Sequence, residues 1–179
     1  MVRIRRGPAV ASSSWTGQEV GRVVEEEQDL VMARIVEAFG LAQAGDGDVA
    51  RLRFAEIWDE IGLGGDPFHR CALAHYAADV QPDVEAELMW DLRALAAADE
   101  VTDERAQRYD GSLSVAEFYP SLHLNLADAY RRFGGQEKAR EHIERAQDAV
   151  GALGDDGYGR LIRDGIVRCA AQIARVEEL

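Results

Sequence analysis

Apolar residues recur every three to four positions from about Glu26 to the end of the chain, which is the period of an amphipathic helix. Alternating runs of β-branched residues, which would indicate strands, do not occur. Short glycine-rich breaks interrupt the helical pattern at residues 44–48, 62–67, 134–135 and 151–159. Helices joined by such short turns form antiparallel hairpins. The pattern therefore predicts an all-α fold.

The segment 120–153 shows the pattern most clearly, because small residues occur at fixed intervals within it. Ala127, Gly134, Ala139 and Ala146 are separated by large apolar residues such as Tyr130. We expect Ala127 and Ala139 to face each other where two helices cross, since larger side chains would push the helix axes apart. Gly134 is expected to end the first helix in a left-handed conformation.

This spacing resembles that of the tetratricopeptide repeat, a helix–turn–helix unit of about 34 residues. Residues 120–153 form one clear copy, and residues 31–64 and 67–100 form two degenerate ones. The degenerate copies depart from the family pattern at Ile57 and Arg93, where a small residue is usual. The resemblance implies hairpins stacked as a short right-handed α-solenoid.

The remaining segments complete a single predicted helical domain over residues 25–179. Residues 101–119 interrupt the repeats and are expected to extend the preceding helix or to add a short one. Residues from about 158 to 177 carry an apolar stripe, and a helix there would cap the last hairpin. Residues 1–24 contain Pro8, Gly17 and a run of serines with no sustained period, so we predict a flexible tail.

By the same resemblance, the first helix of each hairpin lines a concave groove that binds a partner. The groove would grade from apolar in the first repeat to charged in the third. An extended peptide or an amphipathic helix could lie there. The alternative is that the tail or residues 101–119 cover the apolar end. The predicted groove residues are Met32, Phe39, Gln43, Phe68, His75, Asp79, Leu124, Asp128, Arg131 and Arg132.

The charge balance restricts the partner. The chain has 33 acidic and 20 basic residues, a formal net charge of −13. Nucleic acids and anionic membranes require a basic surface, so neither is expected, and a neutral or basic peptide is favoured. No stretch approaches 18 consecutive apolar residues. The only two cysteines, Cys71 and Cys169, are isolated, and no secretory signal precedes them, so we expect a cytoplasmic protein without disulfide bonds.

Candidate chemistry is sparse. Cys71, His75 and Asp79 share one helix face, but three ligands on successive turns span roughly 12 Å and cannot converge on one ion. We therefore expect no catalytic residues, metal or cofactor, and a non-enzymatic protein-interaction module, acting as an adaptor or regulator, is the favoured function. One alternative is self-assembly into a homodimer through Phe39, Trp58, Trp90 or the apolar stripe of the last helix. A metal-dependent helical enzyme ranks third.

Overall fold

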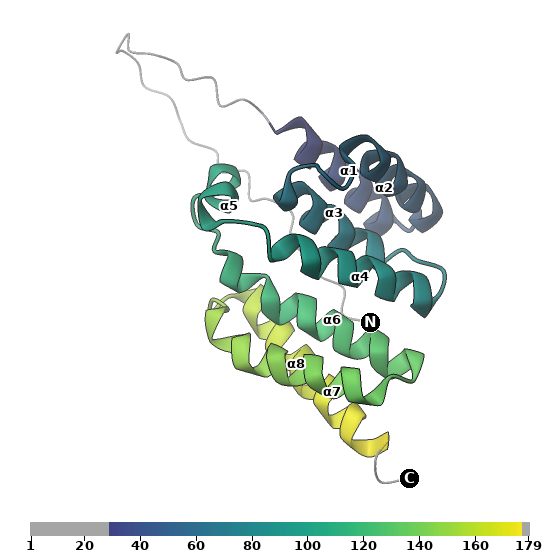
Figure 1. The fold of residues 1–179 in the computed structure, drawn as a ribbon, viewed down its shortest axis with the longest axis vertical. Coiled ribbons are helices and arrows are strands. Elements are labelled where there is room, and N and C mark those ends of the chain that lie inside the picture. The colour runs from purple at the N-terminus through teal and green to yellow at the C-terminus, as the bar shows by residue number, and fades with distance from the viewer. Residues whose placement is uncertain (1–28, 177–179) are drawn as a thin grey trace.

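The computed structural model describes residues 29–176, and within this range the chain forms eight α-helices, two short 3-10 turns and no strand (Figure 1). The all-α prediction is confirmed. The helices and turns are α1 (Leu30–Ala44), α2 (Gly47–Ile61), α3 (Pro67–Ala78), α4 (Val84–Ala98), α5 (Asp103–Tyr109), η1 (Val115–Glu117), α6 (Tyr119–Phe133), α7 (Gln136–Ala149), η2 (Val150–Ala152) and α8 (Gly157–Val176).

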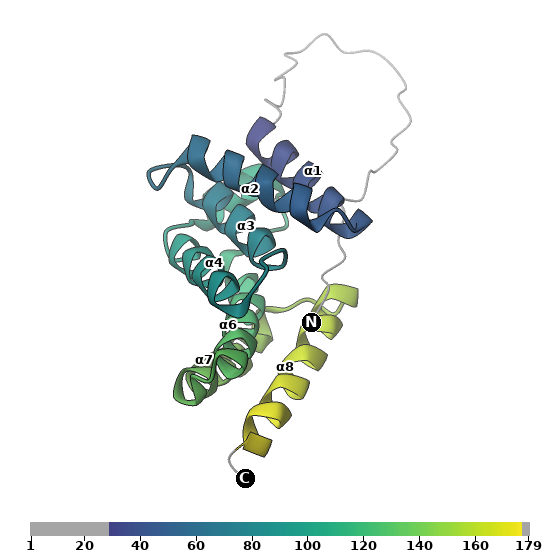
Figure 2. The same cartoon turned by 90° about the vertical axis from the view of Figure 1, so that its right-hand side faces the viewer.

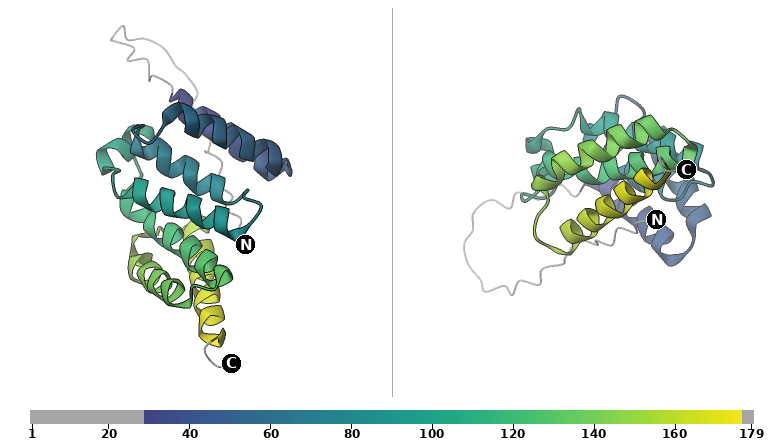
Figure 3. Two further views of the ribbon diagram at one scale, coloured as in Figure 1. Left: turned by 45° about the vertical axis from the view of Figure 1, so that its right-hand side comes forward. Right: turned by 90° about the horizontal axis from the view of Figure 1, so that it is seen from below.

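Three antiparallel hairpins, α1–α2, α3–α4 and α6–α7, stack along the long axis of the molecule (Figures 1 and 3). The second and third hairpins meet through α4 and α6, and α8 packs on α6 and α7 at the end of the stack. This packing is consistent with a helical repeat or solenoid. α8 lies where the sequence predicts a capping helix.

The hairpin turns follow from residues at the helix ends. Gly45 and Gly134 end α1 and α6 with φ of 100° and 94°, a left-handed conformation that glycine adopts without steric cost. The prediction for Gly134 is confirmed. The carboxylates of Asp29, Asp66 and Asp83 accept backbone hydrogen bonds at the starts of α1, α3 and α4, at 2.9–3.0 Å.

Alanines allow the paired helices to approach closely. Ala127 and Ala139 are both fully buried in one apolar cluster between α6 and α7, as the sequence predicts, and Ala146 is buried one turn further along. The neighbouring Lys138 has 56% of its side chain exposed. Ala50, Ala74 and other buried alanines occupy corresponding positions in the first two hairpins.

The apolar interior is divided into two main clusters. One joins α1 to α5 and includes Ile35, Phe54 and Leu73. The other joins α6, α7 and α8 and includes Ile143 and Ile162. Between them lies a small cluster of three buried residues, Leu88 of α4 with Leu126 and Ala129 of α6. The two halves meet where α4 packs on α6, and Leu122 of α6 also reaches the first cluster.

The segment between the second and third hairpins adds the short helix α5, one of the two possibilities that the sequence left open. Arg105 of α5 binds the carboxylates that begin α1 and α3: its Nη2 lies 3.1 Å from Asp29 and its Nε lies 2.5 Å from Asp66. Its guanidinium also stacks 4.7 Å from the ring centre of Phe68. α5 thereby fastens the first two hairpins at their N-terminal ends.

Two further predictions concern the limits of the fold. The proposed tail, residues 1–24, lies outside the described residues. Between residues 29 and 176, no helix is both long and apolar enough to cross a membrane.

The buried alanines give a first test. Ala139→Leu should lower the free energy of unfolding by roughly 1–3 kcal/mol, because the added methylenes do not fit between α6 and α7. Lys138→Leu, on the exposed side of the same helix, should change it by less than about 0.5 kcal/mol. Chemical denaturation of both variants measures the difference, and equal losses would contradict the packing described here.

Candidate functional site

A cleft on the concave side of the stack is the strongest candidate for a functional site. Its volume is about 460 Å³, within the range of roughly 300–1,000 Å³ typical of ligand sites. We call the part of its lining that comes from α6 the floor, and the parts from the α3–α4 turn and from α8 its two walls. Figure 2 shows the backbone of these elements. The lining side chains include Asp79, Glu87, Leu124, Asn125, Asp128, Arg131, Arg132 and Arg168.

The cleft is lined by five of the ten residues that the sequence assigns to the groove: Asp79, Leu124, Asp128, Arg131 and Arg132. Leu124 is only 3% exposed and belongs to the second apolar cluster. Four of them lie on α6 at the helical spacing of one face. The opposite face of α6, with Leu126 and Ala129, packs against α4. Burial of one side of α6 therefore turns the other side toward the cleft.

The apolar groove residues lie elsewhere. Met32 and Phe68 are only 4% exposed and belong to the core, with Phe68 also contacting Tyr109 and Phe118. At Phe68, therefore, residues of the segment 101–119 cover the side chain that the sequence assigns to the apolar end of the groove. Phe39 is half-buried and its ring lies 4.5 Å from that of Tyr76.

Of the two other predicted groove residues, Gln43 is exposed at the end of α1, and His75 is half-buried. Burial lowers the pKa of His75 to about 4, so this imidazole is neutral at pH 7. It does not supply the charge change between pH 5 and 8 that an unperturbed histidine would.

An ion-pair network fixes the floor of the cleft. Asp128 accepts hydrogen bonds from Arg131 Nη2 at 2.7 Å and from Arg132 Nε at 2.9 Å, and Arg132 also pairs with Glu87 of α4. Burial alone would raise the pKa of Asp128, but the two guanidiniums outweigh it and hold that pKa below its usual value. Two arginines and two carboxylates thus neutralise one another.

Two charged side chains on the walls are left out of this network. Asp79, which ends α3, and Arg168 of α8 are exposed by surface area, and neither has a hydrogen bond or an ion pair with another residue of the range 29–176. Partial burial of the carboxyl group, with the charge of Glu87, raises the pKa of Asp79 to about 6, so it is ionised at pH 7.5. The sequence assigns Asp79 to the groove but does not single out Arg168. A signal for Arg168 was present, since it lies off the apolar stripe of the last helix.

Behind the floor lies a buried carboxyl group that sequence reasoning missed. Asp91 of α4 is 1% exposed, and no hydrogen bond of acceptable length and angle reaches either of its side-chain oxygens from the described residues. Burial raises its pKa well above the usual value, and the negative charges of Glu87 and Asp79 add to this rise. The amide of Asn125 opposes the rise without reversing it.

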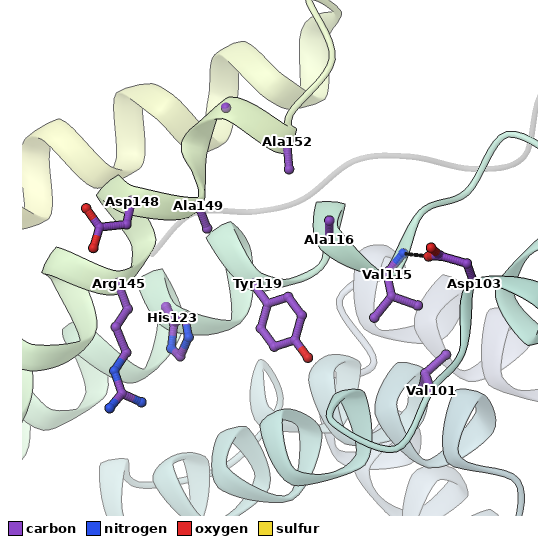
Figure 4. A pocket seen from close by; sticks show the side chains of 11 residues that line it. Val101, Asp103, Val115, Ala116, Tyr119, His123, Arg145, Asp148, Ala149 and Ala152 are labelled. Atoms are coloured by element: carbon purple, nitrogen blue, oxygen red, sulfur yellow. Dashed lines mark hydrogen bonds between the residues drawn. The ribbon is translucent and has the colours of Figure 1, made fainter.

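A second hollow, of about 790 Å³, opens between α5, the start of α6 and the end of α7 (Figure 4). Most of its polar groups already have partners within the fold. The hydroxyl of Tyr119 donates to Asp99 at 3.0 Å, Arg145 pairs with Glu141 at 2.6 Å, and Val115 N donates to Asp103 at 2.7 Å. These groups hold elements together, so this hollow is the weaker candidate.

Two histidines meet behind this second hollow. Nδ1 of His123 on α6 lies 3.1 Å from Nδ1 of His142 on α7, and His142 stacks on Tyr130. Burial, together with the proximity of His123, lowers the pKa of His142 to about 4. One Nδ1 must donate and the other accept, so at least the accepting ring is neutral and the contact is lost when both rings are protonated.

Metal binding is not indicated by the geometry. Among residues 29–176, no three histidine, cysteine or carboxylate side chains lie close enough together to share an ion. Cys71 and Cys169 are free and buried in different clusters.

Comparison with protein-family models, with curated proteins and with solved structures finds no match to this chain. The resemblance to tetratricopeptide repeats therefore stays a prediction from the sequence.

The histidine pair predicts acid sensitivity. The folded-state pKa of His142, about 4, is below the value near 6.5 of an unfolded histidine. The pair therefore contributes stability above about pH 6.5 that is lost as the pH falls toward 4, with a slope of at most about 1.4 kcal/mol per pH unit for one proton. Denaturation between pH 7 and 4 should show this loss, and His142→Phe should reduce the slope. An unchanged slope would contradict it.

Asp91 predicts the opposite trend. Its folded-state pKa is raised, so the stability of the wild-type chain that depends on this group is complete below about pH 4 and is lost as the pH rises. At pH 7.5, Asp91→Asn should therefore raise the free energy of unfolding above that of wild type by roughly 1–3 kcal/mol, measured by chemical denaturation. The gain should shrink at pH 5. Asp59→Asn, on the exposed side of α2, is the matched control.

Proposed function

We propose that this chain is a non-enzymatic protein-interaction module that binds a peptide segment of a partner in the cleft between α3, α6 and α8. The observation that carries the proposal is the pair of charged side chains, Asp79 and Arg168, that face this cleft without partners among the described residues. Solvent-exposed charges in a concave site are available to a ligand at little cost to the fold.

The helical stack supports the same proposal. Stacked hairpins present an extended concave surface, and tetratricopeptide-like repeats use it to bind peptides. The net charge of −13 favours a partner segment that is neutral or basic over an acidic one. The buried free thiols of Cys71 and Cys169 fit a reducing compartment, so we propose the cytoplasm as the site of action.

The surfaces considered for self-assembly are largely used within the chain. Trp58 and Trp90 pack against each other at 5.1 Å, and Arg93 stacks over Trp90 at 4.5 Å. The apolar stripe of α8, including Ile166 and Ile173, is buried in the second core. Peptide binding therefore ranks above homodimer formation.

The test is to select peptides from a random library on the full chain and then to obstruct the cleft. Gln172→Trp places a bulky side chain on the exposed part of the α8 wall without removing an ion pair. The selected peptides should lose about tenfold in affinity or more, equivalent to roughly 1.4 kcal/mol. Fluorescence anisotropy gives the dissociation constants.

The matched control is Gln147→Trp, which adds the same side chain to an exposed position of α7 outside the cleft. It should leave the affinities unchanged. Peptides that bind the Gln172→Trp variant as tightly as wild type would show that the cleft is not the binding site.

A further inference from the structure

The two walls of the cleft carry opposite charge. The wall formed by the α3–α4 turn presents Asp79 and Asp83. One oxygen of Asp83 caps α4 by accepting from Ala86 N at 2.9 Å, which leaves its negative charge in place. The wall formed by α8 presents Arg168. In Figure 2 the turn between α3 and α4 lies above α8, and α6 lies to the left of both.

The charged residues of the floor do not alter this separation of charge between the two walls. Asp128, Arg131, Arg132 and Glu87 neutralise one another through the network described above. A ligand lying on α6 therefore meets negative charge along one edge and positive charge along the other. The site discriminates by the side on which a charge lies, and not only by its sign.

An extended chain matches this arrangement. Side chains of a strand point alternately to opposite sides, so residues i, i+2 and i+4 face one wall and the residues between them face the other. A helix is a poorer fit, because its successive side chains radiate around the axis and do not alternate between two opposite walls. A short isolated helix is also unstable in water.

We infer that the cleft, if it binds peptides as proposed above, selects an extended segment in which basic and acidic side chains alternate. The basic side chains would face Asp79 and Asp83, and the acidic ones would face Arg168. Such a segment has no large net charge, so the acidic chain does not repel it at long range. A uniformly basic segment would place like charge against Arg168, and a uniformly acidic one against Asp79.

Two synthetic peptides of equal composition test this directly. In the first, eight residues alternate lysine and glutamate, so each edge of the strand carries one sign. In the second, pairs of lysines alternate with pairs of glutamates, so each edge carries both signs. Both are blocked at the ends and carry the same fluorophore. At pH 7.5 and low salt, the first should bind the full chain at least about fivefold more tightly.

Charge reversals in the walls sharpen the test. Asp79→Arg combined with Asp83→Asn, which keeps a capping side chain on α4, makes both walls basic, and Arg168→Asp makes both acidic, so each should abolish the preference for the alternating peptide. The triple variant Asp79→Arg/Asp83→Asn/Arg168→Asp restores opposite walls. The alternating peptide can then bind with its direction reversed, so its advantage should return. The reversals Asp59→Arg and Arg53→Asp, on the exposed side of α2, should have no effect.

Circular dichroism establishes that each variant is folded. Equal binding of the two peptides, no binding of either, or a triple variant that does not recover the preference would each overturn the inference. The proposed function is judged separately by the library-selected peptides. If Gln172→Trp weakens those peptides and they show no alternation of charge, the cleft binds peptides but the inference about their pattern is wrong.

Discussion

The close approach of helices at buried alanines is the constraint on which the rest of the structure depends. Ala127 and Ala139 allow α6 and α7 to lie against each other, and Ala74 and Ala50 occur in the earlier hairpins. Because the axes are close, the large side chains are displaced to either side of the crossing. There they form the interfaces with α4 and α8. The orientation of α6, and hence the floor of the cleft, follows from this spacing.

Residues 101–119, between the second and third hairpins, stabilise the first two hairpins as well as connecting the second to the third. Arg105 joins two helix-starting carboxylates and covers Phe68. It also interacts with His69, which in turn lies 2.8 Å from Asp29. The apolar end of the concave face is thereby partly filled from within the chain. This leaves the charged end, between α3, α6 and α8, as the part of the face that a ligand can reach.

The sequence predicted the fold better than the site, for physical reasons. Helical period, glycine breaks and the alanine spacing are local features, and they identified the hairpins, the turn at Gly134 and the final helix. The groove residues depended on which helix faces are left uncovered. Nothing local to Phe68 shows that Arg105, Tyr109 and Phe118, 37 to 50 residues further along the chain, pack on it. Arg168 and Asp91 were missed because their roles depend on contacts between α4, α6 and α8.

The division of the interior into two apolar clusters has a mechanical consequence. The acidic wall of the cleft belongs to the first half of the stack and the basic wall to the second, and the two halves meet where α4 packs on α6, with Leu88, Leu126 and Ala129 buried between them. The width of the cleft therefore depends on how the two halves sit on each other. A molecule that binds both walls would hold the halves in one arrangement, so occupancy of the cleft would restrict their relative motion.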